Sequence, residues 1–325
     1  MVKIIAFLAS KNFVFRSWMY NLLVRTVQVK RLKKIRNKIW NGAVLANVDK
    51  PVSTALHGYK AMVNCGFIYP LIARTYRTFN NPYLQLVYLK FKQKNKPLIV
   101  ADIGAAVGDG VFFLLSNLPG AFEKIICIDG DKEFFNYLLQ NTKYFSFVTA
   151  KQTVLADKSG EIKSLKRIHA GTASAQGDQL VQTTTLDKLF EENNFPAPDI
   201  IKIDTDGFDG KVLSGAQNIL LKHKPAVIFE WHPIHIKDTG NDFYTAFTCL
   251  DATGYSQFVF FNKYGVFTHF MIGFHKEEIE KLVQLCLNEN YEYDWHYDVV
   301  ALQPNDVDIT ELAECAFAKN KKSAY

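Results

Sequence analysis

Short apolar runs rich in Ile, Val and Phe recur through the middle of the chain, and polar or glycine-containing segments separate them. Runs of this kind predict buried strands of a parallel sheet that is covered on both faces. The pattern predicts strands at residues 98–102, 124–129, 147–155, 199–204 and 226–230. We expect helices between them, because alternating strands and helices with right-handed crossovers assemble into a doubly wound α/β sheet.

The pattern changes on either side of this region. Towards the N-terminus it predicts helices at 11–40 and 81–93, the second opened by Asn81 as the cap and Pro82 in the first turn. The later part of the chain is expected to contain helices at 242–253 and 276–287 and strands at 257–261, 266–270 and 297–302. We therefore expect a basic, mostly helical N-terminal extension over residues 1–96 and an α/β domain over residues 97–325.

The segment from Val100 to Gly110 combines a strand end, a glycine turn and a helix start. Gly104, Ala105 and Gly108 allow the backbone to approach a ligand closely, and the following helix offers free N–H groups. The third glycine of the dinucleotide motif G-x-G-x-x-G is absent, which argues against a nicotinamide oxidoreductase. A carboxylate, Asp102, precedes the first glycine, and it suits an amino-bearing ligand such as S-adenosylmethionine (SAM) better than a pyrophosphate.

Acidic residues close the predicted strands. Asp129 lies about 20 residues past the glycine turn, where nucleotide-binding units place the acid that binds the ribose hydroxyls. Asp157 follows the third strand and is predicted to contact the adenine amine, with a role in its own turn as the equal alternative. Ligands of such sheets bind outside the carboxyl ends of the strands, so the same crevice should also collect four further residues. These are Asp204, Asp206, Glu230 and His232.

Three later segments resemble the FkbM family of SAM-dependent methyltransferases in order and spacing. They are TTLDKL from residue 184, IIKIDTDGFDGKVLSG from residue 200 and KPAVIFEWHP from residue 224. The chain departs from the family pattern where Asp206 and Asp209 replace the usual glutamates. The resemblance covers residues 98–240 and implies a class I methyltransferase fold, with residues 297–302 as an antiparallel strand inserted near the sheet edge. It also implies methyl transfer to a hydroxyl group, most often of a saccharide, glycolipid or other natural product.

Transfer to a hydroxyl requires that the hydroxyl lose its proton. Asp204, Asp206, Glu230 or His232 is predicted to act as the base. The first three also offer the oxygen ligands of a divalent cation, which would acidify the hydroxyl instead. Non-catalytic alternatives stay open. Asp204 could hold the SAM amino group, and Asp206 and Asp209 could cap the next helix. The histidines at 232 and 235 could be structural. Aromatic residues between Tyr69 and Phe79 suit either a sugar ring or a packed helical cap.

Charge is distributed unevenly. Residues 1–97 contain 18 Lys and Arg and one acid, and residues 1–40 contain ten bases, no acid and many apolar and aromatic side chains. This composition predicts a peripheral contact of residues 1–40 with an anionic membrane, with packing on the main domain as the alternative. Nucleic acid is a less favoured partner, and it defines the alternative of a nucleic-acid methyltransferase. A SAM-binding protein without catalysis is the alternative from another functional class.

Cellular location is predicted from what the sequence lacks. No apolar run approaches the 18 or so residues needed to cross a bilayer, and the start of the chain does not resemble a secretory signal. The five cysteines form no C-x-x-C pair, which favours reduced thiols over disulfides or a zinc knuckle. We therefore expect a cytoplasmic enzyme that associates peripherally with the inner face of the cell membrane.

Overall fold

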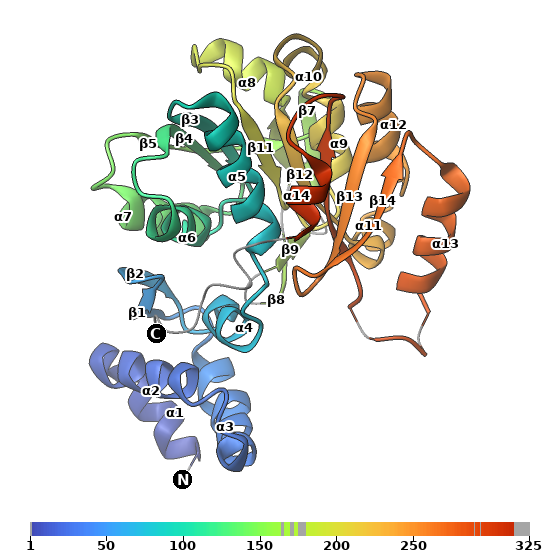
Figure 1. Ribbon diagram of the computed structural model, residues 1–325. Helices are drawn as coiled ribbons and strands as arrows, with labels where there is room; N and C mark the ends of the chain where they lie inside the picture. Colours follow the sequence, from blue (N-terminus) through green and yellow to red (C-terminus); the bar gives the residue numbers. More distant parts are fainter. Residues whose placement is uncertain are drawn as a thin grey trace.

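An eight-stranded sheet forms the centre of the computed structural model, which describes residues 2–163, 166–169, 172–174, 180–288, 290–292 and 294–314 (Figure 1). The strand order is β14-β13-β15-β12-β11-β3-β4-β5. Strands β12 to β5 along this order run parallel, whereas β15 is antiparallel to both β12 and β13, and β13 is antiparallel to β14. The strands are β3 (Leu98–Ile103), β4 (Phe122–Asp129), β5 (Val148–Gln152), β11 (Ile200–Ile203), β12 (Ala226–Trp231), β13 (Gln257–Asn262), β14 (Phe267–Ile272) and β15 (Tyr297–Leu302).

Helices cover both faces of this sheet because successive strand side chains point to opposite sides. On β3, Val100 packs with one helical layer and Ala101 with the other. The first layer contains α5 (Asn81–Lys94), α6 (Asp109–Asn117), α7 (Lys132–Thr142) and α14 (Ile309–Glu314). The second contains α8 (Leu186–Glu192), α9 (Asp209–Ser214), α10 (Gln217–His223), α11 (Pro233–Asp238), α12 (Thr245–Ala252) and α13 (Lys276–Cys286). The expected doubly wound, mainly parallel sheet is confirmed, including the antiparallel insertion of residues 297–302.

Two local predictions were wrong. The single strand expected at 147–155 is interrupted at Thr153, where the chain leaves the central sheet. Its second part, β6 (Val154–Leu155), instead joins a small sheet with β10 (Leu180–Thr184) and β7 (Gly160–Lys163). Helix α5 is capped by Asn80, so that Asn81 is already its first helical residue. A further two-stranded sheet pairs β8 (Lys166–His169) with β9 (Thr172–Ser174).

The N-terminal region is not one long helix. Asn12 ends α1 and starts α2, because its side-chain oxygen accepts the backbone N–H of Phe15 at 2.9 Å. The helical elements are α1 (Val2–Lys11), α2 (Phe13–Arg25), a 3-10 turn (Lys30–Leu32), α3 (Lys33–Ile39), a π-helical turn (Trp40–Val44), a second 3-10 turn (Leu45–Asn47) and α4 (Tyr69–Thr75). A hairpin that the sequence pattern did not reveal joins β1 (Pro51–Leu56) to β2 (Tyr59–Asn64), and both residues of its turn, His57 and Gly58, have positive φ.

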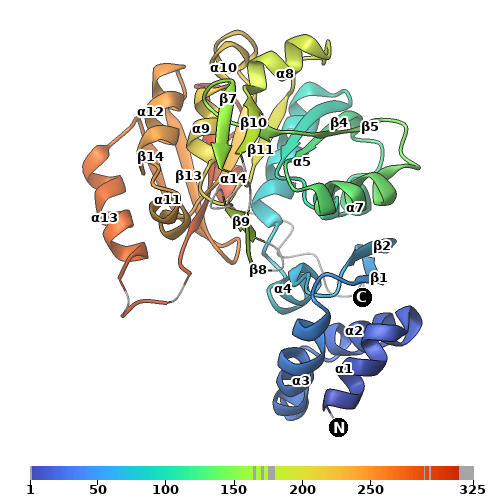
Figure 2. The ribbon, with the colours of Figure 1, turned by 180° about the vertical axis from the view of Figure 1, so that it is seen from behind.

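This hairpin connects the N-terminal helices to the α/β domain. The ring of Tyr59 stacks on Phe112 of α6 at 5.0 Å, and Asn141 of α7 exchanges two hydrogen bonds with the backbone of Met62. Figures 1 and 2 show α1–α3 at one end of the molecule, with β1, β2 and α4 between them and the sheet. The division at residues 96 and 97 stays a prediction. None of the described helices is long and apolar enough to cross a membrane.

Candidate active site

The glycine turn after β3 lies against the end of β11. Gly104 has a φ of +78°, and a Cβ atom there would lie 1.8 Å from the carbonyl oxygen of Asp204. The N–H of Gly104 also donates to the carbonyl of Ile128, at the end of β4, at 2.8 Å. Only glycine fits this position, so the turn draws the ends of three neighbouring strands together. Gly108 has a different role, because it caps α6 and faces the side chains of Leu138 and Thr142 on α7.

Asp129 closes β4 beside this turn and is 8% exposed. One of its oxygens accepts the N–H of Ala106 and the other accepts the N–H of Asp131, both at 2.8 Å. Each carboxylate oxygen has a second lone pair, so both can still receive a hydroxyl group. Burial raises the pKa of Asp129 to about 7, against the lowering effect of these two backbone hydrogen bonds.

Asp102 and Asp204 share one cation. Lys202 on β11 places its ammonium nitrogen 3.6 Å from Oδ1 of Asp102 and 3.2 Å from Oδ2 of Asp204. Burial disfavours the charge on Lys202, but Asp204 and Asp102 together raise the pKa of its ammonium group well above the usual value. Burial raises the pKa of Asp102, and Lys202 partly offsets that rise. Asp102 is therefore a buried, paired carboxylate, while Asp204 is 45% exposed.

Asp206 and Glu230 meet at a histidine. The Nδ1 atom of His235 lies 3.6 Å from Oδ1 of Asp206 and 3.9 Å from Oε2 of Glu230. Burial, followed by the charges of Asp204 and Asp206, raises the pKa of Glu230 well above its usual value. Burial and the neighbouring His232 lower the pKa of His235 to about 4, so this imidazole is neutral at pH 7.

His232 holds His235 in place. It is 1% exposed, and its Nε2 is 2.8 Å from Oδ1 of Asp294. Its Nδ1 accepts the backbone N–H of His235 at 3.4 Å, and the two rings stack at 3.6 Å. Because both ring nitrogens have partners, a direct catalytic role for His232 would require a rearrangement, and this role stays a prediction.

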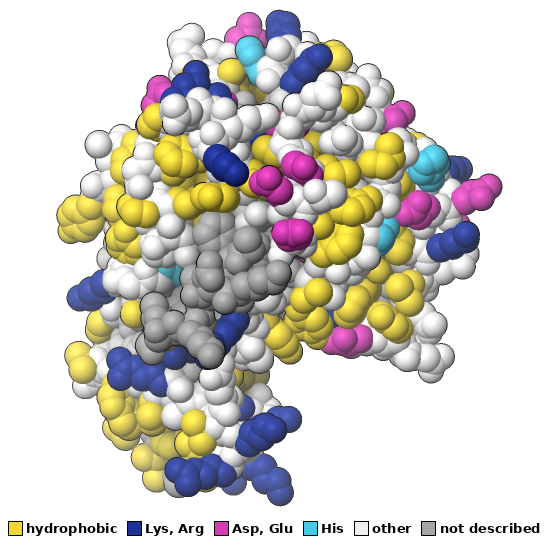
Figure 3. Space-filling model, in the orientation of Figure 1, with side chains coloured by type: hydrophobic (Ala, Val, Ile, Leu, Met, Phe, Trp, Pro, Cys, Tyr) yellow, Lys and Arg dark blue, Asp and Glu magenta, His cyan; other side chains and the backbone are white. Residues whose placement is uncertain are grey.

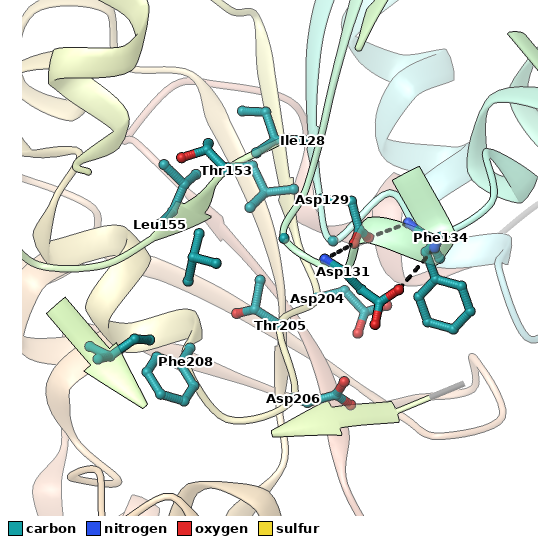
Figure 4. Close-up of a pocket in the computed structure, with 16 residues that line it drawn as sticks. Ile128, Asp129, Asp131, Phe134, Thr153, Leu155, Asp204, Thr205, Asp206 and Phe208 are labelled. Carbon is teal, nitrogen blue, oxygen red and sulfur yellow. Dashed lines mark hydrogen bonds between the residues drawn. The ribbon is translucent and has the colours of Figure 1, made fainter. Parts of the chain in front are cut away.

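Two cavities meet along this row of strand ends. The smaller, about 150 Å³, is lined by Asp129, Phe134, Leu155 and Phe208, and the larger, about 480 Å³, by Glu230, His232 and His235 among others. Gly104, Ala106, Asp204 and Asp206 line both. Figure 4 shows Asp129, Asp204 and Asp206 arranged around the smaller cavity.

The remaining predicted site residues fall into three groups. Asp102 and Ala105 line the larger cavity. Asp157 is exposed and is not among the described residues that line either cavity, and its adenine contact stays a prediction. Asp209 is buried and accepts the Thr205 hydroxyl at 2.9 Å, so it holds the β11–α9 turn rather than capping α9.

Sequence reasoning assigned no role to three residues that line the larger cavity: Lys202, Asp294 and His296. Lys202 was detectable as a charged residue among the isoleucines between the two end aspartates of the strand predicted at 199–204. Asp294 and His296 directly precede β15, whose antiparallel direction brings its first residues to the carboxyl end of β12. His296 lies 3.6 Å from Oε1 of Glu230, and burial and His232 lower its pKa to about 3.

The strand order and these strand-end cavities define a class I, Rossmann-like methyltransferase. The FkbM methyltransferase domain model matches residues 81–257, more than half of the chain, and the chain belongs to that family. No curated protein matches it.

The similar solved structures are distant in sequence. The methyltransferase FkbM from Methylobacillus flagellatus KT is 19% identical over 42% of this chain, with a TM-score of 0.34, and the match spans 33% of that protein. A precorrin-6y C5,15-methyltransferase from Geobacter metallireducens GS-15 is 13% identical over 64% of this chain and 80% of its own, with a TM-score of 0.34. A putative RNA methyltransferase from Pyrococcus horikoshii is 13% identical over 67% of this chain and 81% of its own, also with a TM-score of 0.34.

The family implies SAM as the methyl donor, and the residues present fit it. Gly104 lines both cavities, and Asp129 retains lone pairs for two ribose hydroxyls. Leu155, Ile162 and Phe208 give the smaller cavity apolar walls against which an adenine ring can pack. Asp204, at the junction of the two cavities, offers a carboxylate to an amino group.

Replacing Asp129 by alanine is expected to weaken SAM binding by about 1.5–3 kcal/mol, the usual contribution of hydrogen bonds to a charged group. Titration calorimetry measures this change. Glu123→Ala is the matched control, because Glu123 is exposed at the opposite end of the same strand. Equal SAM affinity in the Asp129 variant and the parent would contradict the ribose assignment.

Proposed function

We propose that this methyltransferase transfers the methyl group of SAM to a hydroxyl group of a saccharide or glycolipid. The observation that carries the proposal is the shared wall of the two cavities. On one side of Gly104 and Asp204 lie Asp129 and apolar side chains suited to SAM, and on the other lies a cluster of carboxylates and histidines. An acceptor in the larger cavity would thus meet the donor at the junction.

SAM supplies an electrophilic methyl group on a sulfonium sulfur. In the transfer, the acceptor oxygen would bond to the methyl carbon, and the electron pair of the broken carbon–sulfur bond would stay on sulfur. The hydroxyl proton would pass to a base. Holding the oxygen in line is the main contribution of the protein to such a displacement. The proton passes to Asp204, Asp206 or Glu230 directly, or leaves more readily once a bound divalent cation has acidified the hydroxyl.

Aromatic residues support a saccharide acceptor. Phe67, Tyr69, Phe79 and Tyr83 line the larger cavity together with the carboxylates. Aromatic faces pack against the apolar face of a sugar ring, while carboxylates and imidazoles accept hydrogen bonds from its hydroxyls. The Tyr69 hydroxyl accepts a hydrogen bond from the side-chain amide of Asn80 and lies 2.7 Å from Nε2 of His57. These two contacts fix its position.

Mass spectrometry of products formed with isotopically labelled SAM tests this function. The acceptor panel contains free glycans, lipid-linked saccharides and RNA. A labelled methyl ether on a sugar hydroxyl is the expected product. Methylated RNA with activity that falls steeply with salt would support the nucleic-acid alternative. SAM binding without turnover on any acceptor would favour a non-catalytic binding protein.

The surface of α1 and α2 supports delivery of such an acceptor by a membrane. The buried face of α2 packs through residues such as Tyr20 and Leu23, but large apolar side chains on the opposite faces of both helices are exposed. They include Phe7 at 62%, Val14 at 73% and Trp18 at 59% exposure. Figure 3 shows hydrophobic side chains gathered over these helices, with Lys and Arg beside them. Apolar side chains among bases favour an anionic lipid surface.

The full chain is therefore expected to cosediment with liposomes that contain anionic lipid, and less so as salt increases. Replacing Phe7, Val14 and Trp18 together by serine should reduce the bound fraction at least severalfold, because each loses apolar area inserted into the interface. Serine at Leu139 and Leu221, which are 45% and 51% exposed elsewhere, is the control. Binding that is unchanged by the triple replacement would remove the membrane from the proposal.

A further inference from the structure

Three potential metal ligands converge in the larger cavity. One carboxylate oxygen each of Asp206 and Glu230 and one ring nitrogen of His235 lie within 4.8 Å of one another. The two contacts of His235 measure 3.6 Å and 3.9 Å, which is too long for hydrogen bonds. Atoms that bind one ion at about 2.0–2.2 Å lie about 3–4 Å apart, so these spacings match a coordination shell.

Two of these atoms lack any other partner. Oε2 of Glu230 and Nδ1 of His235 are buried, and neither has a hydrogen bond within the part of the chain that the structure describes. Buried polar atoms almost always have partners, and this pair has none among the described residues. A cation between them would satisfy both.

The surroundings hold the imidazole in a ligating orientation. The backbone N–H of His235 donates to Nδ1 of His232, and the ring of His235 stacks on that of His232. His232 is in turn held by Asp294. These contacts fix the position of the His235 ring beside the two carboxylates.

The geometry points to a divalent transition-metal site formed by Asp206, Glu230 and His235, with Mn²⁺ as the ion whose ligand preferences it meets. Mg²⁺ and Ca²⁺ prefer sets made only of oxygen, whereas two carboxylates with one imidazole suit a first-row ion. The three protein ligands leave further coordination positions open to the cavity for an acceptor oxygen.

The role of this ion rests on the proposed function. An acceptor hydroxyl bound to the ion becomes more acidic. Its O–H bond then breaks, the electron pair stays on the oxygen, and the proton passes to Asp204. Of the three carboxylates predicted to act as base or ligand, Asp204 is the one outside this ligand set. In this proposal the third metal ligand is therefore His235, and not Asp204 as the sequence had suggested.

Binding of Mn²⁺ to the full chain after EDTA treatment tests the site directly. Electron paramagnetic resonance of free Mn²⁺ is expected to show one bound ion per chain, and pulsed measurements on the bound ion should show coupling to one imidazole nitrogen. His235→Gln and Asp206→Asn should each weaken binding at least about tenfold. His223→Gln, at an exposed histidine of α10, should change it less than twofold. Thermal unfolding and SAM titration verify that each variant is folded.

No Mn²⁺ binding by the parent, or bound Mn²⁺ without nitrogen coupling, would overturn the site. So would a folded His235→Gln variant that binds as tightly as the parent. Activity distinguishes this inference from the proposed function. Methylation of a saccharide that persists in EDTA overturns the role of the ion and leaves the proposed function standing. One bound ion with nitrogen coupling, but no methylated hydroxyl, supports the site and overturns the proposed function.

Discussion

Replacing Gly104 by alanine is expected to abolish measurable SAM binding and to lower the stability of the fold. The added methyl carbon would lie 1.8 Å from the carbonyl oxygen of Asp204, and backbone on both sides leaves no flexible group to move away. The residue also has a φ of +78°, which costs a non-glycine residue about 1–2 kcal/mol. The clash adds to that cost, since it forces β3 and β11 apart where the two cavities meet.

The Gly120→Ala variant separates the cost of a positive φ from the cost of the steric clash. Gly120 has nearly the same φ, +81°, but nothing lies within 4 Å of its Cβ position. Urea unfolding is expected to show a loss of about 1–2 kcal/mol for Gly120→Ala and a clearly larger one for Gly104→Ala. Equal losses, together with intact SAM affinity in the Gly104 variant, would show that the turn does not form the SAM site as described.

Glu230→Gln is expected to reduce turnover on the order of 100-fold or more while SAM affinity changes little. Glutamine keeps the shape of the side chain but can neither accept the proton nor carry the charge that binds a cation. Glu230 lines the larger of the two cavities and not the smaller, so binding of SAM in the smaller one should be spared. Steady-state kinetics with the methylated acceptor, combined with SAM titration, gives both quantities. Glu277→Gln, on the exposed start of α13, serves as the control.

The pH profile gives this prediction a second readout. The pKa of Glu230 is raised well above its usual value, so the carboxylate form that the reaction needs grows as pH rises. Parent activity should therefore increase with pH, and the Glu230→Gln variant should lose that increase. Full activity in a folded Glu230→Gln variant would eliminate Glu230 both as a base and as a metal ligand.

The gathering of residues around the smaller cavity could be predicted because these residues follow local rules. Gly104 and Asp129 lie at fixed distances along the chain from a strand end, and a parallel sheet aligns those ends without further information. The same rule brought Asp206 and Glu230 together. The apolar runs also located the strands of the central sheet, although the run at 147–155 is divided between two sheets.

Other features depend on contacts that spacing does not encode. The sharing of Lys202 between Asp102 and Asp204 depends on pairing between β3 and β11. Which histidine faces the carboxylates depends on how the rings of His232 and His235 stack after the proline turn. The hairpin β1–β2 was missed because its strands are short and only half apolar, and its stability comes from packing on α6 and α7.

The larger cavity has walls from parts of the chain that the family model does not include. Phe67 and Tyr69 precede the matched residues 81–257, and Asp294 and His296 follow them. The described residues that line the smaller cavity, by contrast, all lie within that range. If the larger cavity receives the acceptor, as proposed, members of the family that share the matched domain can differ in the segments around the acceptor. Exchanging residues 67–80 between two members of the family would then show whether these segments set acceptor preference.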